Sequence, residues 1–185
     1  GNIWINQGEL PPTITDPELF SLLDADSDGY ISALEIVSNS DFLWDINGDG
    51  EVNLRDALSS EIGAMSPFMD GQDNDGNGYT DDLLGWDCSG YYGTDDNDPF
   101  PKEDVASNST WAHGTHVAGI LAATTDNDVG MASTAYNGKF LSIKGSRENQ
   151  SGEPGINDGY AGILYAAKAG YYAGTFIIIN NSWGG

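Results

Sequence analysis

The stretch DGYAGILYAAKAGYYAGTFIII, residues 158–179, predicts a helix followed directly by a strand. Small and apolar residues recur at helical spacing over 158–172, and 176–179 is an apolar, mostly β-branched run typical of a strand buried on both faces. The same alternation comes earlier, with a helical pattern over 112–124 and a short apolar strand at 140–143. Because helices and strands alternate, we expect an α/β unit with a parallel sheet.

The predicted sheet contains residues 140–144 and 176–182, with the helices flanking it. The residues at helical spacing are Tyr160, Ile163, Leu164 and Ala167 in one helix, and Val117, Ile120 and Leu121 lie on one side of the other. A chain that ends on a core strand has an unpaired sheet edge, through which copies can associate.

Acidic residues dominate the chain and are unevenly placed. The 185 residues carry a formal net charge of −23, and residues 1–100 contain 22 acids and one base, Arg55. This excess excludes the phosphate-neutralising kind of nucleic-acid binder and a basic membrane-surface patch. We also find no apolar run long enough to span a bilayer. Cys88, the single cysteine, excludes an internal disulfide, and we expect it to be a small buried side chain.

A small helical unit is predicted over 13–63, beginning where Asp16 caps a helix with Pro17 at its first position. Its segment 24–35 matches the twelve-residue EF-hand loop, which surrounds a Ca²⁺ ion with oxygen atoms and turns sharply at Gly29. The expected ligands are Asp24, Asp26, Asp28, Tyr30 through its carbonyl, Ser32 through water, and Glu35. Ser32 and Glu35 also form a capping box for the next helix.

A second loop, 45–56, repeats the pattern and resembles the calcium loops of dockerin modules. Its expected ligands are Asp45, Asn47, Asp49, Glu51, Asn53 and Asp56. Because the aspartate at position twelve is shorter than glutamate, we expect weaker Ca²⁺ binding here than in the first loop. In such paired loops a short β-bridge joins the two positions held here by Ile31 and Val52.

A third loop starts in the same way at Asp73 and has no acid at position twelve. Its candidate ligands are Asp73, Asp75, Asn77 and Tyr79, with Asp81 and Asp82 closing a tighter site. The alternative is a polar surface turn without an ion. Together the three loops predict two to three calcium ions.

The segment HGTHVAGI, residues 113–120, contains the only two histidines. From the residues alone they are either a metal pair or a histidine working at the rim of a cleft. The segment resembles the histidine motif of the subtilases, the subtilisin-like serine proteases. Other segments resemble the family in the same order: GNIWINQGELP at 1–11, DNDGNGYTDDLLGWD at 73–87, VGMAS at 129–133, FLSIK at 140–144, INDGYAGILYAAKAG at 156–170 and IIINNSWGG at 177–185.

The resemblance implies a partial subtilisin-like domain, made of segment 1–12 and core segment 64–185, with 13–63 as an EF-hand-like or dockerin-like insertion. It implies that His113 is the general base of a Ser-His-Asp triad. It also implies that Ser182, Trp183 and Gly184 form the edge that binds an extended peptide or protein substrate, and that the parent protein is secreted.

The family's Asp-Ser/Thr-Gly and Gly-Thr-Ser-Met-Ala motifs, which carry the other two triad residues, are absent from these 185 residues. We therefore expect a fragment of a calcium-dependent protease that is inactive by itself. Two alternatives are a non-catalytic calcium-binding module and a pseudoenzyme.

Overall fold

The computed structural model describes residues 2–61, 64–89, 95–101, 112–146 and 155–183. A 3₁₀ helix, η1, spans Gln7–Glu9. The helices are α1 (Pro17–Leu23), α2 (Ala33–Ser38), α3 (Leu54–Ala57), α4 (His113–Ala122) and α5 (Gly159–Tyr172). The strands are β1 (Ser60–Glu61), β2 (Ala64–Met65), β3 (Gly85–Asp87) and β4 (Ser142–Lys144). Within the described residues no helix has the length and apolarity that a membrane crossing needs.

A small parallel sheet forms the centre of the α/β part. β3 pairs with β4 in the register Gly85↔Ser142, Trp86↔Ile143 and Asp87↔Lys144, and α5 packs against both strands. Gly85 has φ +132, and a Cβ atom there would collide with the carbonyl oxygen of Ser142, so only glycine allows the strands to approach this closely. A buried ion pair of 2.8 Å between Lys144 Nζ and Asp87 Oδ2 also joins the two strands.

The sheet confirms the predicted α/β class and the predicted strand at 140–144, but its composition differs from the prediction. Residues 176–182 pair with no strand in the described chain, and Phe176 and Ile178 are 86% and 82% exposed. The prediction that this run is a core strand is therefore wrong here, because an apolar run forms a strand only where another strand's backbone is available to pair. Strand β3 lies instead within residues 70–104, whose Gly, Asn, Asp and Pro content is typical of a loop.

Both long helices form where the sequence predicts them, but the residues that they bury lie outside the apolar pattern seen in the sequence. In α5 the buried residues are Gly162, Tyr165, Ala166, Ala169 and Gly170. Tyr160 and Leu164, which belong to that apolar pattern, are 85% and 55% exposed. Small residues let α5 approach the strands closely, so its larger apolar side chains point away from them. In α4 only Ala122 is buried.

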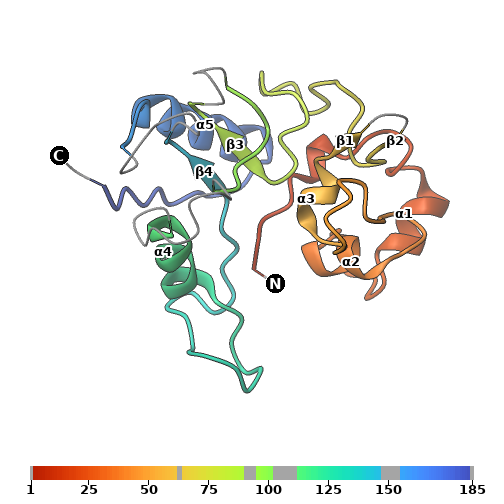
Figure 1. Ribbon diagram of the computed structural model, residues 1–185, viewed down its shortest axis with the longest axis horizontal. Helices are drawn as coiled ribbons and strands as arrows, with labels where there is room; N and C mark the ends of the chain where they lie inside the picture. Colours follow the sequence, from red (N-terminus) through yellow and green to blue (C-terminus); the bar gives the residue numbers. More distant parts are fainter. Residues whose placement is uncertain (1, 62–63, 90–94, 102–111, 147–154, 184–185) are drawn as a thin grey trace.

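The insert, residues 13–63, lies at the opposite end of the molecule from α4 (Figure 1). Its start is confirmed, since the Asp16 side chain accepts from the backbone of α1 and Pro17 is at the first helical position. The insert does not have a core of its own. Its buried side chains, among them Ile31 and Ile36, belong to one cluster with Ile5 and Phe68. The expected separate subdomain therefore shares its core with the N-terminal segment and with residues 68–84.

The N-terminal segment, residues 2–9, makes hydrogen bonds to α4, to Phe140 before β4, to the 24–35 loop and to the loop at 70–82. The Asn2 side chain donates to the last carbonyls of α4, at Ala122 (2.9 Å) and Ala123 (3.3 Å). Ile3 forms an isolated parallel bridge with Phe140, just before β4. Residues 5–9 then run between the insert and the loop at 70–82.

Candidate functional site

The first acidic loop, 24–35, has the geometry of a cation-binding loop. Carboxylate oxygens of Asp24, Asp26 and Asp28 lie within 4.8 Å of one another. The chain turns at Gly29, whose φ is +82 and whose N–H donates to Asp24 Oδ2 at 3.0 Å. Converging carboxylates of this kind suit a hard cation such as Ca²⁺.

Glu35, at position twelve, holds this loop closed. Its carboxylate accepts from the backbone N–H groups of Ala25 (2.7 Å) and Ser32 (2.8 Å), which confirms the predicted capping box. Burial alone would raise the pKa of this carboxyl, but the hydrogen bonds from Ser32, Ala25 and Asp26 outweigh burial and lower it. The loop therefore keeps Glu35 ionised beside the three aspartates.

The second loop, 45–56, is built in the same way with a shorter acid. Asp56 is fully buried and accepts from the N–H groups of Ile46 (2.8 Å) and Asn53 (2.9 Å). The Gly50 N–H donates to Asp45 Oδ2 at 3.0 Å, while Asp45 Oδ1 is buried without a hydrogen-bond partner. The Asp49 N–H donates to Asn47 Oδ1 at 2.9 Å, and Glu51, expected to act through its carbonyl, is exposed.

The two loops are not joined through Ile31 and Val52 as the sequence predicts. The Ile31 N–H donates to Gln7 Oε1 (2.9 Å), and Gln7 Nε2 donates to the Ile31 carbonyl (3.0 Å). Val52 is 46% exposed. The Gln7 side chain thus takes the place of the partner strand, so the expected bridge between the loops is wrong.

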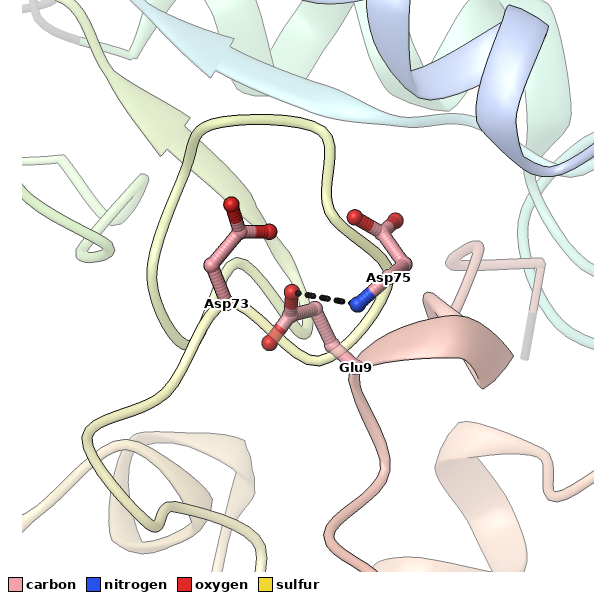
Figure 2. A group of neighbouring side chains, drawn as sticks. All are labelled: Glu9, Asp73 and Asp75. Carbon is pink, nitrogen blue, oxygen red and sulfur yellow. Dashed lines mark hydrogen bonds between the residues drawn. The ribbon is translucent and has the colours of Figure 1, made fainter.

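The third loop contains a carboxylate cluster that sequence spacing does not reveal. Glu9 of η1 lies beside Asp73 and Asp75, and oxygens of all three fall within 4.8 Å of one another (Figure 2). The loop turns as the other two do, with the Gly78 N–H donating to Asp73 Oδ2 at 2.8 Å. Glu9 comes 64 residues before Asp73, so no local motif could have identified it.

The two expected closing acids of this loop have other partners. Asp81 accepts from the backbone of Asp70 and Gly71 at 3.0–3.2 Å. Asp82 is fully buried and accepts from the side chains of Asn6 (2.9 Å) and Asn77 (3.0 Å). The ring of Tyr79 packs edge-on against Trp86 and Tyr165, which fixes the loop against β3 and α5.

Glu9 is the most deeply buried acid in this cluster. Its side chain is fully buried, Oε2 has no hydrogen-bond partner, and Oε1 accepts from the Asp75 N–H at a long 3.4 Å. Burial, followed by the charges of Asp82 and Asp75, raises the pKa of Glu9 to about 8. Asp73 Oδ1 is likewise buried without a partner. Unpartnered carboxylate oxygens converging from two segments fit a calcium ion, which binds oxygen ligands and supplies the missing positive charge.

His113 is the first residue of α4, where the sequence predicts a helix, and its side chain is exposed. The exposed Ser182 Oγ accepts from Asn180 Nδ2 at 2.8 Å. The ring of Trp183 lies on Gly159 at the start of α5, where a Cβ atom would come within 2.6 Å of the indole. Gly184 lies outside the described residues.

Comparison with known proteins identifies the family. The model of the subtilase family matches residues 64–185, which is well over half of the chain. This chain belongs to the subtilase family. The match covers α4 with His113, both strands of the parallel sheet, α5 and the third acidic loop.

Curated relatives of this subtilase chain are named as proteases. The chain is 36% identical over 90 residues to an "Extracellular basic protease" of Dichelobacter nodosus, covering 49% of the chain and 13% of the relative. It is 28% identical over 131 residues to a "Thermophilic serine proteinase" of Bacillus sp. strain AK1, covering 71% and 27%. An "Extracellular protease" of Xanthomonas campestris pv. campestris is 51% identical over 39 residues, covering 21% and 7%. The chain thus spans a small part of each relative's length, and no solved structure matches it.

Proposed function

We propose that the chain is part of a secreted, calcium-binding, subtilisin-like serine endopeptidase. The family match and the proteases among its relatives support peptide-bond hydrolysis as the reaction of the whole protein. Two relatives carry the word extracellular in their names, which supports export of the parent protein.

In the proposed enzyme His113 is the general base that takes the proton of the nucleophilic serine. Its exposed position at the start of α4 leaves the imidazole accessible to such a partner. The segment Ser182–Trp183–Gly184 pairs with the extended backbone of a peptide substrate. Trp183 stands where the family usually has an aliphatic residue, so a bulkier wall is expected beside the bound peptide.

Calcium binds at the three acidic loops, and the buried carboxylate of Glu9 carries this proposal. A fully buried glutamate with a free oxygen beside two aspartates is costly without a cation. An ion there would join η1 to the loop at 73–78, and so hold residues 2–9 against the rest of the fold. Calcium supplies charge and coordination at this site, while the fold's own residues position the helix that carries His113.

Calorimetric titration of Ca²⁺ into the chelated chain tests the calcium proposal. We expect two to three sites, with one site lost in each of Asp28→Ala, Asp49→Ala and Asp73→Ala. The loop with Glu35 should bind more tightly than the one with Asp56. Fewer than two sites in the wild-type chain would contradict the proposal.

The catalytic part is tested in the intact parent protein. We expect His113→Ala to abolish hydrolysis of a casein substrate without loss of calcium sites, because His113 is remote from all three loops in the sequence. The matched control is His116→Ala, which removes the other histidine of α4. Full activity of the His113→Ala protein would exclude the assigned role.

A further inference from the structure

We propose that the first acidic loop and the Glu9 cluster bind calcium cooperatively, because residues 5–9 form a rigid connection between them. This inference rests on the proposed calcium binding and adds a direct coupling between two of the sites. The first acidic loop comprises residues 24–35, and the Glu9 cluster comprises Glu9, Asp73 and Asp75.

Two residues of the first loop, Tyr30 and Ile31, form hydrogen bonds with the connection. The hydroxyl of Tyr30 accepts from the Ile5 N–H at 2.6 Å and lies 3.2 Å from the Ile5 carbonyl, to which it donates. The Gln7 side chain brackets the backbone of Ile31 with hydrogen bonds of 2.9 and 3.0 Å. Both loop residues occupy the turn at positions seven and eight, and the Tyr30 carbonyl is itself an expected calcium ligand. Ordering this turn around an ion therefore orders Ile5 and Gln7.

The other end of the connection belongs to the Glu9 cluster. Asn6 Nδ2 donates to Asp75 Oδ2 (3.0 Å) and to Asp82 Oδ1 (2.9 Å). Asn6 Oδ1 also accepts from the Gly8 N–H (3.2 Å), which caps the short turn of η1 that ends in Glu9. Ile5, Asn6 and Glu9 are all fully buried. Gln7 is two residues from Glu9 within the same turn, so fixing one restricts the other.

Within the part of the chain that the structure describes, no such hydrogen-bonded connection joins the second acidic loop to the Glu9 cluster. The hydrogen bonds of its ligands Asp45, Asn47 and Asp49 stay within 45–56. Filling the second loop should therefore leave the affinity of the Glu9 cluster unchanged. Coupling between binding sites is reciprocal and commonly amounts to roughly 5- to 150-fold. We expect about tenfold between the first loop and the Glu9 cluster.

Three glycine amides provide separate reporters of the three loops. Gly29, Gly50 and Gly78 each donate from their N–H to the first aspartate of their own loop, at 3.0, 3.0 and 2.8 Å. The experiment is a CaCl₂ titration of the chelated, ¹⁵N-labelled full chain, following these amides by NMR. In Asp28→Ala, which disables the first loop, the midpoint of the Gly78 amide should rise about tenfold. In Asp49→Ala, which disables the second loop, the Gly78 midpoint should stay within about twofold of the wild-type midpoint.

Variants of the connection separate coupling from folding. Tyr30→Phe keeps the buried ring and removes only the hydroxyl, and Gln7→Leu removes both bonds to Ile31. In a chain that carries both changes, Asp28→Ala should no longer raise the Gly78 midpoint. Tyr160→Phe is the matched control, because Tyr160 is 85% exposed and lies in α5, and it should preserve the tenfold effect.

The outcomes are distinct. A Gly78 midpoint that is equal in wild type and Asp28→Ala overturns the coupling, and so does an equal shift caused by Asp49→Ala. If Gly29 and Gly78 do not respond to calcium at all, the proposed calcium binding itself fails, and the coupling fails with it. A tenfold effect that survives the double change Tyr30→Phe and Gln7→Leu refutes the connection through residues 5–9.

Discussion

Replacing Glu9 by glutamine should change the stability of the protein in opposite directions with and without calcium. Glutamine keeps the shape of the side chain and removes its charge. Glu9 is fully buried, and its carboxylate lies within 4.8 Å of those of Asp73 and Asp75. Without an ion, the wild-type protein has to protonate Glu9 below its pKa of about 8, and above that pH it has to keep these like charges together. With an ion the same charge becomes a ligand.

The size of the effect follows from these distances. A pair of like charges at the 4.8 Å separation costs about 1 kcal/mol in water, and about 3.5 kcal/mol at an effective dielectric constant of about 20. At pH 9, above the Glu9 pKa of about 8, Glu9 makes two such pairs, so Glu9→Gln should stabilise the calcium-free protein at this pH by at least about 2 kcal/mol. At 100 times Kd one calcium site adds about 2.7 kcal/mol to the wild type, and the variant should lose most of that increment.

Thermal unfolding at pH 9, in chelator and in excess calcium, measures both effects. For a chain of this size about 1 kcal/mol shifts Tm by roughly 2–4 °C. The variant should therefore melt about 4–8 °C above wild type in chelator, and at or below wild type in calcium. Glu18→Gln is the matched control, because Glu18 is exposed on α1, and its effect should stay within about 0.5 kcal/mol in both conditions.

Two results would refute this reasoning. If Glu9→Gln is less stable than wild type in chelator, the buried carboxylate has a compensating partner and is not strained. If calcium raises Tm equally in wild type and variant, Glu9 is not a ligand. The second loop is intact and uncoupled from Glu9, so its contribution cancels in the comparison, whereas any weakening of the coupled first loop adds to the increment that the variant loses.

Four further predictions follow from the sequence and the fold. The isolated chain should not react with fluorophosphonate probes, because triad residues act as a unit and the Asp and Ser motifs are absent from its sequence; labelling at Ser182 would contradict this. Lys144→Met should lower the free energy of unfolding, measured in urea, by about 3–5 kcal/mol, because it removes the cation paired with the buried Asp87 carboxylate. A loss of less than about 1 kcal/mol would argue against the importance of this ion pair. Burial raises the pKa of Cys88 to about 12, so iodoacetamide at pH 8 should alkylate it only as the protein unfolds, and rapid labelling of the folded chain would be inconsistent with the buried site. The exposed apolar face of α5 should promote self-association in analytical ultracentrifugation, and Leu164→Asp should weaken it; equal association of both proteins would exclude this face.

Features decided by neighbouring residues were predicted well. The capping box of Ser32 and Glu35 forms as expected, because both partners lie within one helical turn. The predicted helices at 112–124 and 158–172 differ from α4 and α5 by at most two residues at either end. In each loop the glycine at position six turns the chain toward the first aspartate, since that geometry depends on a few consecutive residues.

Features that depend on distant surfaces were missed. The apolar pattern of α5 has two faces, and the sequence could not indicate that small residues such as Gly162 would meet the sheet while Leu164 faced outward. Residues 176–182 have the composition of a strand, but strand formation needs a second backbone at hydrogen-bonding distance. In the described residues the partner of β4 is β3, which lies within residues 70–104, a stretch of loop-like composition.

The amino-acid sequence by itself determined the family, the positions of the three acidic loops and the helix that carries His113, because these are properties of short contiguous segments. Only the tertiary structure decided that Glu9 joins Asp73 and Asp75, and that Gln7 rather than Val52 pairs with Ile31. These contacts join residues 24 to 66 positions apart, and no spacing rule covers them. They form because residues 5–9, of which Ile5, Asn6 and Glu9 are fully buried, run between the insert and the third loop, where each buried polar group has to find a partner or retain an uncompensated charge.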